Sequence, residues 1–179
     1  RNTLNKELFS VGEYWSTDVN KLHRYITETK GQISLFDVPL HYNLEVASKN
    51  PNYDLSKILE KTLLKENPAK AVTFVDNHDT QPGQSLQSFV DKWFKQSAYS
   101  IILLRQDGYP CVFYGDLYGI PHDNIEPVKD IQLLMQLRKE KAYGIQHDYF
   151  DNPNYIGWTR EGDEEHLRSG VAVVITNRG

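Results

Sequence analysis

The fold is decided by one stretch of the chain, Ala71-Val72-Thr73-Phe74-Val75-Asp76-Asn77-His78-Asp79-Thr80. Its first half is a short apolar run, which is typical of a buried parallel strand. Its second half places acid, amide and imidazole groups where that strand leaves the core. In α/β barrels the reactive residues follow the carboxyl ends of the strands. The stretch therefore predicts a strand of a parallel sheet that ends in a functional loop.

A second apolar run ends in the same way, since residues 8–12 lead into Glu13-Tyr14-Trp15. Trp15 predicts an apolar wall that desolvates the Glu13 carboxyl and raises its pKa, so that it can donate a proton near neutral pH. The alternative is that Glu13 caps the next helix or pairs with a lysine. Two carboxyl groups that converge at one barrel mouth suit acid-catalysed cleavage of a glycosidic bond.

Strand and helix patterns alternate along most of the chain. We expect strands at 7–13, 33–39, 70–76 and 110–115, and helices at 17–30, 54–66, 86–106 and 125–142. This alternation predicts a parallel sheet with right-handed crossovers. After Gly144 the pattern changes, and two strands at 155–159 and 171–176 predict an antiparallel unit.

The size of the chain limits the barrel interpretation. Four βα units cannot close an eight-stranded barrel, which needs about 250 residues. An open doubly wound sheet is therefore the structural alternative. No Gly-x-Gly-x-x-Gly follows any expected strand, so the sequence gives no support to a dinucleotide site.

The composition excludes some classes of partner. The net charge of −4 argues against nucleic acid, and no apolar stretch is long enough to span a bilayer. Cys111 is the only cysteine, so no internal disulfide can form. Because it lies in an apolar run, we expect a buried structural thiol.

The polar residues after the third strand suggest distinct roles. His78 can donate to a sugar hydroxyl, and Asp79 can stay ionised beside a developing oxocarbenium charge. A metal site of His78, Asp76 and Asp79 is the alternative, although their close spacing suits one tetrahedral centre poorly. We expect structural roles, in salt bridges or in hydrogen bonds to backbone amides, for Asp37, Asp76 and Asp116, and packing or surface positions for His41, His122 and His147.

Four segments in order resemble the α-amylases of glycoside hydrolase family 13, in particular the bacterial liquefying and intracellular type. They are residues 11–15 (VGEYW), 35–42 (LFDVPLHY), 74–83 (FVDNHDTQPG) and 109–116 (YPCVFYGD). The likeness continues through residues 148–151 and 157–162, so it covers nearly the whole chain.

The resemblance implies a fold and a role for each site residue. Residues 1–143 would be the second half, strands 5–8, of a TIM (β/α)8 barrel, and residues 144–179 the incomplete start of a C-terminal antiparallel β-sandwich domain. Glu13 matches the general acid/base after strand five. Asp79 matches the acid after strand seven that holds sugar hydroxyls and stabilises the transition state. His78 matches a substrate-binding histidine, and Trp15 would line the cleft.

The family's nucleophile is an Asp in a segment of the form Gly-x-Arg-x-Asp-Ala, and no such segment occurs here. We therefore expect this fragment to be inactive alone and to fold poorly. The family's main calcium site would lie upstream, and we expect no metal within this chain. Pro153, Asn154 and Asn177 stand where many secreted members carry His or Asp ligands for another calcium, so that site is expected to be absent or weak.

The resemblance implies retaining endo-hydrolysis of α-1,4 bonds in starch, glycogen and maltooligosaccharides. The alternatives are a maltooligosaccharide-forming or transglycosylating member of the same family, and a catalytically inactive glucan-binding scaffold. We expect an α-1,4-glucan substrate, no nucleic-acid or membrane partner, and a monomer when the protein is full length. The weak calcium ligands point to the cytoplasm, and secretion stays open.

Overall fold

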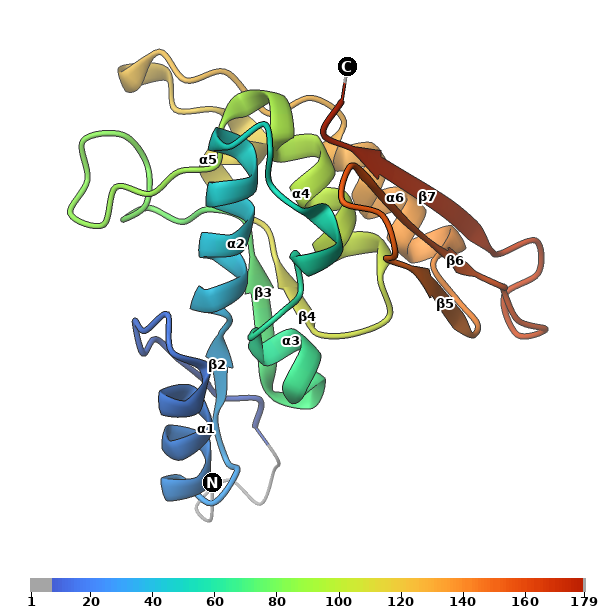
Figure 1. Ribbon diagram of the computed structural model, residues 1–179, viewed down its shortest axis with the longest axis horizontal. Helices are drawn as coiled ribbons and strands as arrows, with labels where there is room; N and C mark the ends of the chain where they lie inside the picture. Colours follow the sequence, from blue (N-terminus) through green and yellow to red (C-terminus); the bar gives the residue numbers. More distant parts are fainter. Residues whose placement is uncertain (1–7, 179) are drawn as a thin grey trace.

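The computed structural model describes residues 8–178, and its centre is a parallel sheet (Figure 1). Within these residues the sheet has the order β1-β2-β3-β4, formed by Val11–Gly12, Ser34–Phe36, Ala71–Phe74 and Tyr109–Cys111. All three pairings are parallel. The alternation in the sequence therefore predicted the sheet, and all four carboxyl ends lie on one edge.

Helices connect and cover these strands. The α-helices are α1 Val19–Glu28, α2 Val38–Lys49, α3 Leu63–Glu66, α4 Lys92–Leu104, α5 Tyr114–Tyr118 and α6 Ile131–Lys141. Short 3₁₀ helices are η1 Leu55–Lys57, η2 Pro68–Lys70 and η3 Pro121–Asp123. Among these helices, none is both long and apolar enough to cross a bilayer.

The expected helix at 54–66 is wrong, and the helix after β2 lies earlier in the chain. α2 begins directly after Asp37, whose carboxylate accepts a hydrogen bond from the Leu40 amide at 3.2 Å. Pro39 stands in the first turn, where its missing N–H costs nothing. Residues 54–66 instead form η1 and α3, separated by Lys61 with a φ of +54°.

The expected burial of Cys111 is also wrong, because its side chain is exposed. β4 is the edge strand of the described sheet, and its residues alternate between exposed and half-buried positions. α4 and α6 start six residues later than expected, at Lys92 and Ile131.

An antiparallel sheet follows, in the order β5-β6-β7, as Figure 1 shows beside α4 and α6. Its strands are β5 Gln146–Tyr149, which the sequence did not reveal, β6 Tyr155–Arg160 and β7 Val171–Thr176. The buried Trp158 belongs to the same hydrophobic cluster as Leu22 and Phe94. Its indole N–H donates to the Leu104 carbonyl at 3.3 Å. The two sheets therefore share one core, and a domain boundary at residue 143 stays a prediction.

Candidate active site

Glu13 and Asp79 both follow carboxyl ends of the parallel sheet. Glu13 comes directly after β1, and Asp79 lies in the turn after β3. β2 separates these strands, so their backbones lie about 10 Å apart at the usual strand spacing. The loops after β1 and β3 leave the sheet toward the same side in Figure 1. The fold therefore puts both acids on one edge.

The turn that carries His78 and Asp79 is held by its own side chains. Asn77 Oδ1 accepts hydrogen bonds from the amides of Asp79 at 2.9 Å and Thr80 at 3.0 Å, which is an Asx turn. Thr80 Oγ1 donates to Asp76 Oδ1 at 3.0 Å. The turn leaves the His78 ring 74% exposed and the Asp79 side chain 33% exposed, with 3.6 Å between Nε2 and Oδ2. Both groups are free to meet a ligand.

A network of buried charged residues packs against this turn on its core side. Lys95 of α4 pairs with Asp76 Oδ2 at 2.8 Å and with Asp116 Oδ1. Tyr99 donates to Asp116 Oδ2 at 2.7 Å, and the Val90 amide donates to Asp76. Burial raises the pKa of Asp76 to about 6, against the opposing effect of Lys95. The structural roles expected for Asp76 and Asp116 are confirmed.

Asp37 is structural as well. Its buried carboxylate accepts hydrogen bonds from the amides of Leu63 at 3.0 Å and Leu64 at 2.6 Å, in addition to Leu40. Burial raises the pKa of Asp37 to about 6, although these donors lower it. Asp37 therefore joins the start of α2 to the start of α3.

His41 is a buried packing residue. Its Nδ1 donates to the Val75 carbonyl at 2.6 Å, and its ring stacks on Phe74 with 5.1 Å between centroids. Burial lowers the pKa of His41 to about 4. The ring is therefore neutral at pH 7, and it braces the backbone just before the turn that carries His78 and Asp79.

Trp15 does not form the expected wall against Glu13. Its indole N–H donates to the Tyr42 hydroxyl at 3.3 Å, and its ring packs near His41 and Phe74. Glu13 is exposed and has no hydrogen bond or ion pair within residues 8–178. The aromatic ring turns toward the sheet, so the Glu13 carboxyl is not desolvated here.

The sequence did not reveal Lys95 or Tyr42. Lys95 reads as a surface charge, although it lies four residues before the buried Tyr99 and so shares its helix face. That spacing was the available signal. Tyr42 gave no signal, because its contact with Trp15 joins α2 to the segment between β1 and α1, far apart in the sequence.

The described residues do not offer a metal centre. No group of three His, Cys, Asp or Glu side chains in residues 8–178 is arranged to hold an ion. Around the second calcium position, the Arg178 guanidinium donates to Asn154 Oδ1 at 3.0 Å, and Asn177 Nδ2 donates to the Tyr53 carbonyl at 2.8 Å. Calcium prefers carboxylate oxygens. The positive charge of Arg178 beside Asn154 disfavours calcium binding there further. Asn177 Oδ1 is buried without a partner among residues 8–178, but this one neutral oxygen is a poor ligand set for a calcium ion.

Sequence comparison gives strong relatives. No family model matches the chain. It is 56% identical over 179 residues to an α-amylase of Geobacillus stearothermophilus, covering 99% of this chain and 33% of that protein. It is 46% identical over 99% of its length to a glucan 1,4-alpha-maltohexaosidase of Bacillus sp. strain 707, and 42% identical over 96% to a cytoplasmic α-amylase of Escherichia coli K12. It spans 35% and 37% of those two proteins, so the chain covers about one third of its relatives.

Structural comparison agrees on the fold. The chain aligns with a gamma-CGTase from Bacillus clarkii at a TM-score of 0.61 and 22% identity, covering 95% of this chain and 28% of that one. It aligns with AmyP in complex with maltose at a TM-score of 0.59 and 17% identity, covering 94% of this chain and 45% of that one. These neighbours are barrel enzymes, and the parallel sheet followed by an antiparallel sheet is consistent with part of such a barrel and a β domain. With relatives at 42–56% identity along nearly its whole length, the chain belongs to the α-amylase family.

Proposed function

We propose that this chain supplies two of the reacting carboxyl groups of an enzyme that hydrolyses internal α-1,4 bonds of starch and glycogen with retention. Glu13 acts as the general acid/base, and Asp79 holds sugar hydroxyls and stabilises the oxocarbenium-like transition state. The observation that carries this proposal is the position of both acids on one sheet edge, in a chain 56% identical to an α-amylase.

Two further residues would bind the substrate. The exposed His78 ring can donate to a sugar hydroxyl beside Asp79. Trp15 would line the cleft with the part of its ring that Tyr42 leaves half-exposed. In this assignment β1 to β4 are strands 5–8 of the barrel, and residues from 144 onward begin the C-terminal β domain.

A retaining enzyme needs a nucleophile about 5–5.5 Å from the acid. No Gly-x-Arg-x-Asp-Ala segment occurs in the 179 residues, so the nucleophile would come from another part of the protein, and these residues alone would be inactive. The full-length enzyme would take α-glucans as its substrate and act as a monomer. The compartment is open, since relatives include a cytoplasmic enzyme.

The test is Glu13→Gln in the full-length protein, assayed for reducing ends released from amylose. Loss of the general acid should lower kcat about 10²–10⁴-fold with amylose binding retained. Glu164→Gln, at an exposed glutamate of the β6–β7 connection, is the matched control and should keep full activity. Full activity of Glu13→Gln would overturn the assignment. If the full-length wild type binds amylose but releases no sugar, the protein is a catalytically inactive glucan-binding scaffold.

The second candidate is a maltooligosaccharide-forming enzyme, which the 46% identity to a maltohexaosidase favours. Chromatography of the products of amylose digestion separates the two. A broad mixture of chain lengths supports the endo-hydrolase. One dominant maltooligosaccharide supports the second candidate.

A further inference from the structure

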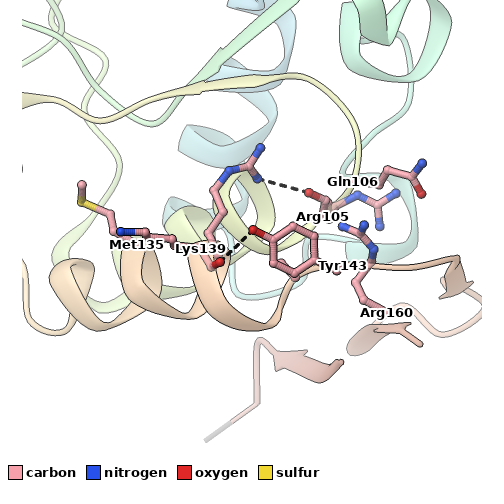
Figure 2. A pocket seen from close by; sticks show the side chains of 8 residues that line it. Arg105, Gln106, Met135, Lys139, Tyr143 and Arg160 are labelled. Carbon is pink, nitrogen blue, oxygen red and sulfur yellow. Dashed lines mark hydrogen bonds between the residues drawn. The ribbon is translucent and has the colours of Figure 1, made fainter. Parts of the chain in front are cut away.

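A cavity of about 380 Å³ lies where the ends of α4 and α6 meet β6. Four cationic side chains line it, and none of its lining residues is acidic: Arg105, Arg138, Lys139 and Arg160. Figure 2 shows Arg105, Gln106 and Arg160 close together beside Tyr143. Arg105 comes before β4 begins, so the cavity lies at the amino end of the parallel sheet, opposite the edge that carries Asp79.

The protein fixes these side chains without a ligand. Arg138 Nη1 donates to the Leu103 carbonyl at 2.6 Å and to the Arg105 carbonyl at 3.4 Å. Arg160 Nε donates to the Gly144 carbonyl at 3.0 Å. The Nη atoms of Arg105 pair with Asp148 at 2.7 and 2.8 Å. These guanidinium groups are therefore already ordered, which lowers the entropic cost of binding a ligand through their remaining N–H donors.

Several donors in the cavity lack an acceptor. Arg105 Nε is buried in a side chain that is 4% exposed, and it has no hydrogen-bond partner among the described residues. Within residues 8–178, no acceptor is found for the Nη atoms of Arg160 or for Lys139 Nζ. Lys139 is exposed, so its ammonium group is open to solvent and can exchange water for an anion.

The positive charge is also only partly neutralised. Among residues 8–178, Asp148 is the single carboxylate that pairs directly with any of the four cations. Burial lowers the pKa of Arg160, and the neighbouring Arg138 lowers it further, while Asp107 and Asp163 act in the opposite sense. Burial lowers the pKa of Arg138 as well. The folded chain thus holds mutually repelling cations around an open space.

We propose that this cavity binds a tetrahedral oxyanion, namely phosphate, either free or as the monoester of a sugar. Guanidinium groups match phosphate oxygens with paired N–H donors, and the Nη atoms of Arg160 are available for such pairing. The volume is in the range of small-ligand sites, so a sugar phosphate fits as well as the free ion. The site is independent of Glu13 and Asp79, and it does not depend on the proposed hydrolysis.

The experiment is isothermal titration of the full-length protein with sodium phosphate, against sodium chloride at the same ionic strength. Saturable binding of one phosphate is expected. Arg160→Lys keeps the charge but loses the paired donors, and Lys139→Gln removes a charge at an exposed position, so each should weaken binding about tenfold. Lys129→Gln, at an exposed lysine outside the cavity, should leave the affinity unchanged.

Glucose 6-phosphate and glucose in separate titrations identify the source of the phosphate group. Tighter binding of glucose 6-phosphate than of phosphate indicates a sugar ester, and equal affinity indicates the free ion. Circular dichroism shows whether Arg160→Lys is folded. If that variant does not fold, Lys139→Gln alone tests the proposal. The proposal is overturned if neither phosphate compound binds saturably, or if the folded variants bind as tightly as the wild type.

Discussion

Lys95 Nζ lies 2.8 Å from Asp76 Oδ2 and also pairs with the carboxylate of Asp116, so one buried cation joins the ends of β3 and β4. Burial lowers the pKa of Lys95, but the two carboxylates outweigh this effect and raise it overall. Asp76 in turn holds Thr80, which closes the turn bearing His78 and Asp79. The geometry of the candidate site therefore depends on a largely buried lysine of α4.

Lys95→Met should destabilise the full-length protein by about 3–5 kcal/mol, because two buried carboxylates lose their counter-charge. Urea unfolding followed by tryptophan fluorescence measures the change. Adding Asp76→Asn to Lys95→Met should restore part of the stability. A loss below about 1 kcal/mol would contradict the role given to this network.

Asn77→Ala should lower kcat about ten- to a hundredfold with little change in KM, because Asp79 and Thr80 lose the amide acceptor that fixes the turn. Asn77→Asp keeps an acceptor at the same place and should recover most of the activity. Steady-state kinetics on a soluble maltooligosaccharide separates the two constants. Equal activity of the two variants would show that the turn needs no such support.

Asp79→Asn should lower kcat about 10²–10³-fold without unfolding the protein, because its carboxylate is partly exposed and bonds no other element. Asp151→Asn, at an exposed aspartate before β6, is the matched control. Activity on amylose and the thermal midpoint are measured for both. If the control loses as much activity as Asp79→Asn, the assignment of Asp79 fails.

His41 makes stability depend on pH in a defined window. Its pKa is lowered from 6.5 to about 4 in the folded state, so the unfolded chain binds more protons between these values. Its contribution is present above pH 6.5 and is lost as the pH falls toward 4. The advantage of the wild type over His41→Gln in unfolding free energy should therefore shrink by about 3 kcal/mol from pH 7 to pH 4.

Asp37 and Asp76 change stability with pH in the opposite direction to His41. Their pKa values are raised in the folded state, so they favour folding below pH 4, and this contribution is lost as the pH rises toward 6. Both are present in the wild type and in His41→Gln, so their effects cancel in the comparison. Asp76 Oδ1 lies 3.9 Å from His41 Nδ1, and among the other charges Glu45 raises the pKa of the ring while Lys49 and Lys95 lower it. A pH-independent difference between the proteins would show that His41 titrates normally.

The sequence predicted the parallel sheet and the positions of the acids because both follow from local pattern. Apolar runs that end in acids mark strand ends, and these occur where the structure has β1 and β3. At 54–66 the apolar spacing correctly predicted burial of Leu55 and Leu63 but not the broken helix. Helical spacing reports which residues are buried, whereas a single left-handed residue such as Lys61 decides where the backbone turns.

The start of α2 lies inside the strand expected at 33–39, because a proline such as Pro39 can end a strand or begin a helix. After Asp37 the proline belongs to the first turn of a helix. What favours the helix is the set of three backbone amides that donate to the Asp37 carboxylate, and two of them come from α3. The direction of the Trp15 ring and the ion pairs of Lys95 depend on long-range contacts in the same way. Such contacts leave no periodic trace in one sequence.

The hydrogen bond from Trp158 to the last carbonyl of α4 has a consequence for anyone who recombines these enzymes. Next to it, Arg105 spans from the end of the same helix to Asp148 and stacks on Phe150 and Trp158. In a chimera joined at residue 143, α4 and Arg105 would come from one parent and Asp148, Phe150 and Trp158 from the other. Exchange of the antiparallel sheet between relatives should succeed only where the donor brings a matching indole and carboxylate.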